Sequence, residues 1–441
     1  MNQILADGLS VKTESSATTL EVKHLLGSGG QGEVYRADLA GKPMALKWYF
    51  ERYLQVDPHL RMRLQTAIDS GPPSDRFLWP MELASARGVP GFGYVMPLRA
   101  ARFKGIIDVL RRRVDSSFRA LATAGFEMAD SFLQLHARGL CYRDISFGNV
   151  FFDPGTGEVR VCDNDNVDVN GQPGAITGTP GFMAPEVVDG EAMPARETDL
   201  FSLSVLLFYM FMFSHPLHGK KEADIDCLDL PAMRKLYGTE AVFIFDPHDQ
   251  SNAPVPERHS NALTMWPIYP QFLRDRFTKA FTVGISDPKD GRIRETEWRA
   301  SMVRLRDCIV YCSACAAENF YDERGTPEGS PNGRRLCWAC TKVFRLPPRL
   351  RIGKKVLMLN HDTKLYPYHV DSVNTYDFSA PVGEVARHPS DPDLWGLRNL
   401  TKQTWVVGLS DGTVREVEPG RSVTLALGAK IQFGKAEGEI V

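Results

Sequence analysis

Alternating hydrophobic and polar residues in the first hundred positions predict a series of β-strands. The strands are expected at residues 20–26, 33–39, 44–47, 77–83 and 92–96. Helical spacing replaces this alternation at residues 57–67, where Leu60, Leu64 and Ala67 share one face, and again at residues 103–138. The first part of the chain is therefore expected to be a small sheet followed by helices.

The end of the chain returns to a strand pattern. From residue 352 to 441, short apolar alternations are separated by turn sequences such as Ser410-Asp411-Gly412. We expect a small β-sandwich there, after a linker at residues 345–349. Between these regions, the most apolar run covers residues 200–213; it is too short to span a bilayer and indicates a buried helix.

Composition indicates the broad class of the protein and the environment in which it works. The 441 residues are 43% hydrophobic and carry a formal net charge of −2. This predicts a globular chain of roughly two to four domains and favours neither nucleic acid nor a membrane as partner. Residues 1–19 are polar and lack the apolar core of a signal peptide. Together with eight cysteines, this leads us to expect a reducing, cytoplasmic environment.

Four of the cysteines form two Cys-x-x-Cys pairs, Cys312 with Cys315 and Cys337 with Cys340, separated by twenty-one residues. Two such pairs give a tetrahedral thiolate cage suited to Zn²⁺. The loop between them is rich in Gly and Pro and would not pack a core of its own, so the zinc is expected to be structural. The alternative is four unrelated buried cysteines. A fifth cysteine, Cys308, has the wrong spacing to join the cage.

Residues 27–34 read Gly-Ser-Gly-Gly-Gln-Gly-Glu-Val. Without side chains, the backbone at Gly27, Gly29 and Gly32 can lie close over nucleotide phosphates. The dinucleotide-binding motif shares these glycines but opens a helix, whereas here a strand continues, which favours a hairpin. A plain glycine turn is the alternative.

Four polar residues after this segment are further candidates for the site. Lys47 lies in an apolar strand; the alternative is an edge lysine that extends its charge to water. Asp144 and Asn149 stand five apart in the sequence Tyr-Arg-Asp-Ile-Ser-Phe-Gly-Asn. Asp163 ends a predicted strand fourteen residues after Asn149, and a solvated acidic turn is the alternative there.

These motifs, in this order, resemble a protein kinase of the serine/threonine, eukaryotic-like branch, in a compact bacterial style. Residues 27–34 match the glycine-rich loop, residues 44–47 resemble Val-Ala-Ile-Lys, and residues 142–149 resemble the catalytic loop. Residues 178–186, Gly-Thr-Pro-Gly-Phe-Met-Ala-Pro-Glu, resemble the end of an activation segment. The resemblance covers residues 20–309 and implies a bilobal α+β fold.

The resemblance implies a reaction and assigns roles. ATP and Mg²⁺ would serve transfer of the γ-phosphate to Ser or Thr of a protein substrate. Lys47 would hold the α- and β-phosphates, Asp144 would orient the acceptor hydroxyl, and Asn149 and Asp163 would hold Mg²⁺. The nucleotide would also contact residues of the glycine loop, the third strand and the hinge between lobes: Gly27, Gly29, Gly32, Val34, Ala45, Lys47, Met96 and Leu98.

Further positions are expected to support the site. Asp199 resembles the Asp that braces the catalytic loop from a buried helix, and Arg292 resembles the Arg that pairs with Glu186 of Ala-Pro-Glu. Kinases also supply a Glu to pair with the strand lysine. No Glu lies between positions 51 and 82, so Gln65 is the nearest candidate to hold Lys47.

The chain departs from the family pattern at four positions. Tyr142 replaces His and Asn164 replaces Phe, which changes both halves of one hydrophobic contact. Asp165 replaces Gly and is expected to reduce flexibility, and Ser146 replaces the Lys that faces the γ-phosphate. These departures, with Gln65, support an alternative function: a nucleotide-binding pseudokinase that acts as a scaffold.

A regulatory hypothesis concerns the activation segment. Thr177 and Thr179 are its acceptor hydroxyls, and Thr179 is expected to bond near Asp144. Thr177 follows a stretch at residues 171–176 that contains Gly and Pro and is expected to be mobile. A phosphate on Thr177 would pair with Arg143 and order the segment. The alternative is that Arg143 bonds only backbone carbonyls.

The predicted organisation therefore combines five segments. These are an N-terminal tail at 1–19, a kinase N-lobe at 20–98, a C-lobe at 99–309, a zinc ribbon at 310–343 and a β-sandwich at 344–441. The later strands of the sandwich, including residues 397–401 and 431–434, resemble a forkhead-associated domain, although its phosphate-binding residues are not evident. A kinase with a trailing ribbon resembles those of bacterial phosphorylation triads linked to tellurite resistance. That resemblance implies a phosphatase and a von Willebrand A protein as partners.

Overall fold

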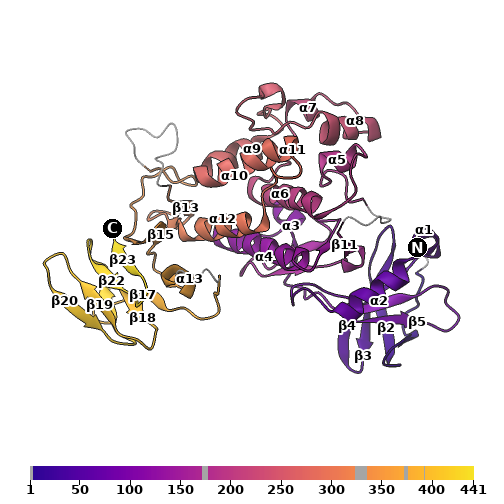
Figure 1. Cartoon of the computed structure of the whole chain (residues 1–441), viewed down its shortest axis with the longest axis horizontal. Helices are drawn as coiled ribbons and strands as arrows, with labels where there is room; N and C mark the ends of the chain where they lie inside the picture. Colours follow the sequence, from indigo (N-terminus) through magenta and orange to yellow (C-terminus); the bar gives the residue numbers. More distant parts are fainter. Residues whose placement is uncertain (1–2, 171–176, 323–334, 372–375, 392) are drawn as a thin grey trace. The chain divides into compact units, whose positions relative to one another are not determined.

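The computed structural model describes all residues except 1–2, 171–176, 323–334, 372–375 and 392. The chain forms two compact units, shown in Figure 1. Unit 1 comprises Met1–Trp266 and Phe272–Met302, and unit 2 comprises Pro267–Gln271 and Val303–Val441. The stretch at residues 171–176, for which mobility was expected, and most of the predicted ribbon loop lie outside the described residues.

Unit 1 begins with a closed barrel in the order β1-β2-β3-β4-β6-β5. Its strands are β1 Ser10–Thr13, β2 Thr19–Ser28, β3 Gly32–Leu39, β4 Lys42–Tyr49, β5 Glu82–Ser85 and β6 Gly93–Pro97. The described part of the expected tail, residues 3–19, instead belongs to this fold: β1 pairs with β2 and β5, and Leu5 and Val11 are buried in the barrel core. The strand expected at 77–83 is displaced: only Glu82 and Leu83 of that range lie in β5, which continues to Ser85, while Phe77 forms an isolated bridge with Val161.

Two helices accompany the barrel, α1 Glu51–Val56 and α2 Leu60–Ser70. Leu60 and Leu64 are the buried residues of α2, as the helical spacing predicted, and they pack with Ala45, Tyr94 and Met96 of the barrel. Gly71 ends α2 at a φ of 66°, a backbone conformation that glycine adopts without steric cost.

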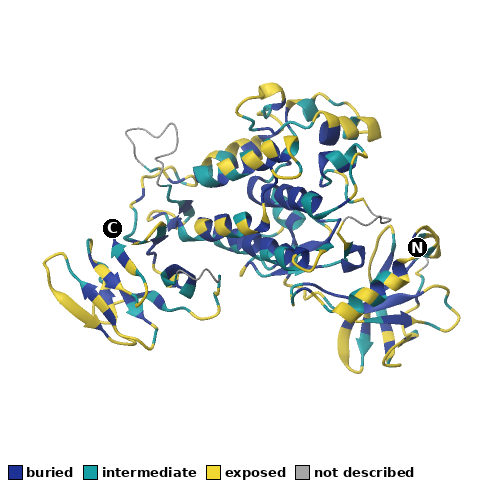
Figure 2. Cartoon of the chain, viewed as in Figure 1, coloured by how far each residue is buried: buried dark blue, intermediate teal, exposed yellow. Residues whose placement is uncertain are grey.

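The rest of unit 1 is helical. The pattern at residues 103–138 forms two helices, α3 Ile106–Leu110 and α4 Phe118–His136, because Ser117 caps a new helix by accepting a hydrogen bond from the Ala120 N–H. The apolar run forms α6 Arg196–Met212, which Figure 2 shows as buried along nearly its whole length. The remaining helices are α5 Pro185–Val188, α7 Lys220–Ala223, α8 Leu230–Arg234, α9 Ser260–Met265, α10 Gln271–Phe281, α11 Val283–Ser286 and α12 Glu295–Asp307.

Short strands and turns carry the segments with the candidate chemistry. These are β7 Lys104–Gly105, β8 Leu140–Cys141, β9 Val150–Phe152, β10 Val159–Val161, the 3-10 helix η1 Asn164–Asn166, and β11 Asp168–Val169. β9 lies between β7 and β10, and β8 pairs with β11. The predicted catalytic loop therefore joins β8 to β9, and Asp163 lies two residues after the end of β10.

Unit 2 contains a small hairpin and two larger sheets. β12 Ile309–Tyr311 pairs with β13 Glu318–Phe320 beside the four cysteines. One sheet has the order β15-β14-β23-β22-β19-β20 and the other has the order β16-β17-β18-β21. The strands are β14 Arg349–Ile352, β15 Lys355–Met358, β16 Lys364–Leu365, β17 Gly383–Arg387, β18 Trp395–Asn399, β19 Trp405–Gly408, β20 Val414–Val417, β21 Ser422–Thr424, β22 Lys430–Gln432 and β23 Glu437–Ile440, with one short helix, α13 Pro367–Val370.

The two sheets share one core, in which Leu350 and Ile431 of the first pack with Val385 and Leu397 of the second. This confirms the all-β end of the chain.

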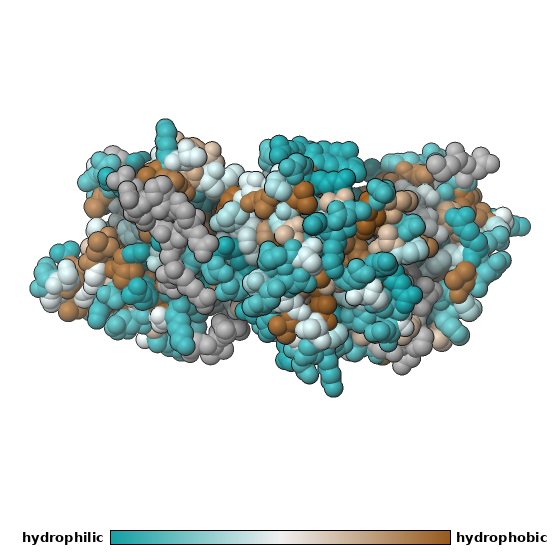
Figure 3. All heavy atoms as spheres, turned by 90° about the horizontal axis from the view of Figure 1, so that it is seen from above, coloured by the Kyte–Doolittle hydropathy of each residue, from teal (hydrophilic) through white to brown (hydrophobic). Residues whose placement is uncertain are grey.

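On the face seen in Figure 3, hydrophobic residues form small groups among hydrophilic ones. Among the described residues, no helix is long and apolar enough to cross a membrane.

A buried charged network joins the helices of unit 1. His136, at the end of α4, contacts Asp199 of α6 through Nε2 at 3.1 Å and Glu295 of α12 through Nδ1. Burial disfavours the imidazolium, but the hydrogen bonds of Asp199 and Glu295 outweigh it and raise the pKa of His136 from 6.5 to about 9. The cation therefore ties three helices together at neutral pH.

This network predicts a dependence of stability on pH. Because the folded pKa of His136 is raised, its stabilisation is fully present below pH 6.5 and is lost as pH rises through 9. We expect His136→Gln to lower the free energy of unfolding by about 3 kcal/mol at pH 6, and this deficit to shrink markedly by pH 9.5. Urea unfolding of both proteins at the two pH values measures it. A deficit of equal size at both would contradict a charged His136.

Candidate active site

The glycine-rich segment forms a hairpin and not the start of a helix. β2 and β3 pair up to Gly27 with Val34 and Ser28 with Glu33, and the Gly29 N–H donates to the Gly32 carbonyl at 2.9 Å. A Cβ on Gly32 would lie 2.1 Å from the Trp48 carbonyl oxygen, so only glycine fits there. At Gly27, Gly29 and Gly30 a Cβ would meet nothing within 4 Å, which leaves one side of the loop open. The predicted hairpin is confirmed.

The ammonium group of Lys47 is buried and has three polar partners. Its Nζ lies 2.6 Å from Oδ1 of Asp163, 2.8 Å from Oδ2 of Asp165 and 2.5 Å from Oε1 of Gln31. The alternative of an edge lysine that extends its charge to water is therefore excluded. Asp163 and Lys47, predicted from separate motifs, are brought together.

The partner expected from helix α2 is not the one observed. Gln65 donates from Nε2 to Asp69 Oδ1 at 2.8 Å, within its own exposed helix face, and makes no contact with Lys47. Its place is taken by Asp165, which the sequence indicated only as a less flexible substitute for glycine. The prediction for Gln65 was wrong because an i, i+4 hydrogen bond to Asp69 holds its amide within α2.

The two aspartates differ in exposure. The side chain of Asp165 is fully buried, and it also accepts a hydrogen bond from Tyr49 Oη at 2.5 Å, while that of Asp163 is 33% exposed. Burial raises the pKa of Asp163 above its ordinary value, in spite of the opposing effect of Lys47. For Asp165, the charge of Lys47 and its hydrogen bonds outweigh burial and lower the pKa.

The catalytic loop holds Asp144 through both carboxylate oxygens. Oδ1 accepts a hydrogen bond from Thr179 Oγ1 at 2.5 Å, and Oδ2 accepts one from Asn149 Nδ2 at 2.9 Å. The expected bond between Thr179 and Asp144 is therefore present. The carbonyl of Asn149 accepts from the N–H of Cys162 at 2.8 Å, which connects the loop to the strand that precedes Asp163.

Asp199 braces this loop as expected. Its carboxylate accepts hydrogen bonds from the backbone N–H groups of Tyr142 at 2.5 Å and Arg143 at 2.9 Å. Arg143 has a φ of 73°, a left-handed conformation that costs energy in a residue other than glycine. The bond to Asp199 stabilises that conformation.

The two substituted positions, Tyr142 and Asn164, are both buried and make new hydrogen bonds, although the Oδ1 of Asn164 has no hydrogen-bond partner among the described residues. The Tyr142 hydroxyl donates to the Cys162 carbonyl, and its ring packs edge-on against Phe132 with centroids 5.5 Å apart. Asn164 donates from Nδ2 to the carbonyls of Leu78 at 2.9 Å and Val161 at 3.0 Å. Polar contacts thus replace the expected hydrophobic one.

The end of the activation segment is anchored to the helical part of unit 1. Arg292 contacts both carboxylate oxygens of Glu186, at 2.9 and 2.7 Å, which is the pairing that the resemblance to protein kinases implied. The Arg292 side chain is 2% exposed, and its burial lowers its pKa. Such a buried cation requires this partner.

The remaining candidates are apolar residues predicted to contact the nucleotide and the two residues of the regulatory hypothesis. Ala45 and Met96 are buried in one cluster, with Val34 and Leu98 packed against it, so four of the residues expected to contact the nucleotide lie together. Thr177 is exposed beside the undescribed stretch. Arg143 forms an ion pair with Asp168 at 3.2 Å, so the alternative in which it bonds only backbone carbonyls does not hold.

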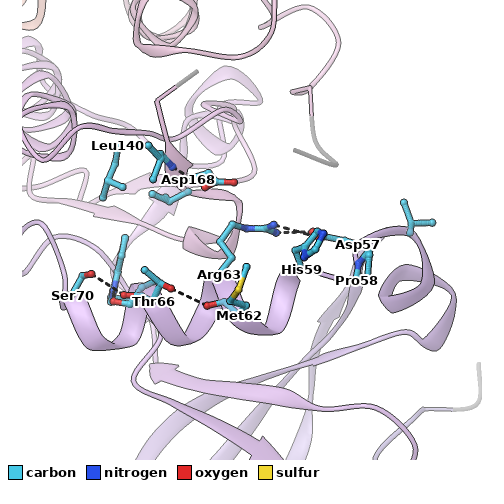
Figure 4. Close-up of a pocket in the computed structure, with 14 residues that line it drawn as sticks. Asp57, Pro58, His59, Met62, Arg63, Thr66, Ser70, Leu140 and Asp168 are labelled. Atoms are coloured by element: carbon cyan, nitrogen blue, oxygen red, sulfur yellow. Dashed lines mark hydrogen bonds and ion pairs between the residues drawn. The ribbon is translucent and has the colours of Figure 1, made fainter. Parts of the chain in front are cut away.

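A separate pocket of about 680 Å³ lies along α2, on the side drawn in Figure 4. Met62, Arg63 and Thr66 of α2 line it together with Val167 and residues of β11. Lys47, Asp144, Asn149 and Asp163 are not among its lining residues.

The four cysteines of unit 2 converge as predicted. All four Sγ atoms lie within 4.8 Å of one another, and Cys312 to Cys340 and Cys315 to Cys337 are each 3.7 Å apart. A tetrahedral zinc site with Zn–S bonds of about 2.3 Å has S–S edges of about 3.8 Å, so the four thiols fit this metal. The alternative of four unrelated cysteines is excluded.

The two cysteine turns have the same backbone geometry. In each, the fourth residue after the first cysteine has a positive φ: Ala316 at 61° and Thr341 at 58°. Its N–H donates to the carbonyl of that first cysteine, at 2.9 and 2.8 Å. Backbone and side-chain N–H groups also point at sulfur, from Ala314 to Cys312 at 3.4 Å and from Asn319 to Cys337 at 3.5 Å. Such donors favour thiolates.

Comparison with known proteins agrees with this geometry. Residues 96–265 match the model of the protein kinase domain. The DNA damage-responsive serine/threonine-protein kinase RqkA of Deinococcus radiodurans is 29% identical over 214 residues, which are 46% of this chain and 31% of that protein. Serine/threonine-protein kinase SRK2F of Arabidopsis thaliana is 24% identical over 208 residues, 45% of this chain and 56% of that protein.

Other similarities are shorter. Protein kinase C delta type of Mus musculus is 32% identical over 95 residues, 21% of this chain and 14% of that protein. The chain thus matches less than two thirds of the length of these relatives. The fold class is confirmed: a kinase domain is followed by a four-cysteine cluster and all-β sheets. The chain therefore contains a protein kinase domain, and its relatives are serine/threonine-protein kinases.

Proposed function

We propose that the chain is an ATP- and Mg²⁺-dependent protein kinase that phosphorylates Ser or Thr of protein substrates. The observation that carries this proposal is the convergence of Lys47 on Asp163 at 2.6 Å, together with Asp144 held by Asn149 and Thr179. Phosphoryl transfer depends on positioned charges more than on covalent chemistry, so these groups are the ones it needs.

Each residue has one proposed task. Lys47 holds the α- and β-phosphates, and the backbone from Gly27 to Gly32 covers them. Asp144 orients the substrate hydroxyl. Asn149 and the partly exposed Asp163 offer oxygen atoms to Mg²⁺, a cation that prefers carboxylate and amide oxygens. Bound Mg²⁺ would neutralise charge on the transferred phosphate.

Unit 2 is proposed to serve docking. The four thiols of Cys312, Cys315, Cys337 and Cys340 are proposed to hold a structural Zn²⁺, in keeping with their distances. The two-sheet sandwich is proposed to be similar to a forkhead-associated domain and to contact protein partners. A phosphatase and a von Willebrand A protein are the partners that the resemblance to bacterial phosphorylation triads favours, and a cytoplasmic location suits all three.

The kinase proposal is tested by radiolabelled ATP with Mg²⁺ and purified protein. Asp144→Ala should reduce transfer of label about 10²–10⁴-fold, since the acceptor hydroxyl loses its orienting carboxylate. Asp411→Ala, in an exposed turn of unit 2, is the matched control and should keep full activity. Equal labelling of the wild type and Asp144→Ala, or none with any partner present, would favour the pseudokinase scaffold instead.

The zinc proposal is tested by metal analysis of protein purified without chelator. One zinc per chain is expected, and Cys337→Ser should lose it and loosen the ribbon while the kinase domain stays folded. Cys308→Ser should retain the metal, because the Cys308 thiol instead donates to the Leu305 carbonyl at 3.2 Å. Zinc-free wild-type protein would refute the site.

The proposed switch at Thr177 is tested by mass spectrometry after incubation with ATP, which should find phosphate on this residue. A phosphate there would compete with Asp168 for Arg143. Thr177→Ala should therefore slow substrate phosphorylation and leave the dissociation constant for ATP nearly unchanged. Full activity of Thr177→Ala would show that the switch does not exist.

A further inference from the structure

The buried carboxylate of Asp165 has no task in the reaction as proposed above, although it contacts Lys47 directly. Both of its oxygens face Nζ, at 3.1 and 2.8 Å. Tyr49 donates to Oδ2 at 2.5 Å and Tyr94 to Oδ1 at 3.4 Å. The side chain is therefore fixed by three donors in a site without solvent contact.

Helix α2 supplies no carboxylate to this site. Its one acidic residue, Asp69, is exposed and accepts a hydrogen bond from Gln65. Arg63, which α2 does direct toward η1, is paired with Asp57 at 2.6 Å and donates from Nε to the Asp165 backbone carbonyl at 3.4 Å. The side chain of Arg63 thus connects α2 to the backbone carbonyl of Asp165 in η1. The carboxylate of Asp165 remains available to Lys47.

Lys47 has two carboxylates beside its single positive charge, and these carboxylates differ in their access to solvent. Two carboxylates share one ammonium group, which leaves one negative charge in excess. The Asp163 side chain is partly open to solvent, whereas the Asp165 side chain is closed. A divalent cation that arrives with the nucleotide can therefore take Asp163, while Asp165 stays on the lysine.

We propose that Asp165 is the positioning residue for Lys47, in the role that a carboxylate on the helix corresponding to α2 serves in other protein kinases. This rests on the proposed function of Lys47 as the ligand of the α- and β-phosphates. Because η1 follows Asp163 directly, the metal ligand and the lysine partner are fixed by one rigid turn. Correct placement of Lys47 then does not depend on where α2 lies.

Binding of a fluorescent ATP analogue with Mg²⁺ to the full chain tests this. Asp165→Asn keeps the shape but removes the charge, and should weaken binding roughly tenfold to a hundredfold, the effect of losing one charged hydrogen bond. Gln65→Ala is the matched control and should bind as the wild type does. Unchanged binding in Asp165→Asn, or an equal loss of binding in Gln65→Ala, would overturn the proposal.

A double-mutant cycle separates positioning from a general effect on folding. If Asp165 acts through Lys47, then Asp165→Asn should cause no further loss in the Lys47→Ala background. Losses that multiply in the double variant would show that Asp165 acts otherwise. If Asp165→Asn does not fold, Tyr49→Phe repeats the cycle with a milder change, because it removes only the hydroxyl that donates to Asp165 Oδ2. A loss of nucleotide binding in Tyr49→Phe that persists in the Lys47→Ala background would likewise refute the role.

The binding experiments test the role of Asp165 whether or not the protein transfers phosphate. Absence of kinase activity with the binding cycle intact would reject the proposed function and keep the role of Asp165. Where activity is present, Asp165→Asn should raise the KM for ATP and leave the KM for the peptide substrate unchanged. An equal change in both constants would contradict a role confined to the nucleotide.

Discussion

The buried ammonium group of Lys47 is the charge on which the site of the kinase domain depends. A cation that is 3% exposed is costly unless carboxylates surround it. Its partners come from three places in the chain: the glycine hairpin through Gln31, the end of β10 through Asp163, and η1 through Asp165. Satisfying one charge therefore brings together three of the segments that a nucleotide is expected to touch.

A second buried charge fixes the catalytic loop in the same way. Asp199 accepts from the backbone of Tyr142 and Arg143, and it is itself held by His136, which Glu295 holds in turn. The position of Asp144 is thus determined by the packing of α4, α6 and α12. Asp163, at a φ of 54°, and Arg143, at 73°, are both held in left-handed conformations close to strong hydrogen bonds. Strain at both positions is offset by the surrounding charges.

Much of this could be predicted because it is local in sequence. Glycine spacing predicted the hairpin, apolar spacing predicted the buried helices, and the cysteine spacing predicted the cluster. The pairs Glu186–Arg292 and Thr179–Asp144 are distant in sequence and were expected only from the resemblance to protein kinases. A substitution with a new long-range partner could not be predicted in this way.

Asp165 is the clearest case of that limit. In the sequence, an Asp in place of a Gly indicates only a change in backbone freedom, since its partners Tyr49 and Tyr94 lie on distant strands. The strand β1 was missed for a related reason, because its four residues contain too little alternation to be distinguished from a tail. In both cases tertiary contacts decide the role of a residue whose local pattern is neutral.

The cysteine cluster shows how a small module manages without a core of ordinary size. The buried cluster beside the two turns consists of Val310, Cys312, Cys337 and Phe344, so half of it is thiol. Apolar burial on this scale cannot offset the entropy of ordering the surrounding chain. The matched turns at Ala316 and Thr341 add strained backbone to that cost. Four converging sulfurs, with N–H groups aimed at two of them, fit a metal ion. In the proposed function, the binding energy of that ion replaces the missing core, so the metal of this module would act on conformation and not on catalysis.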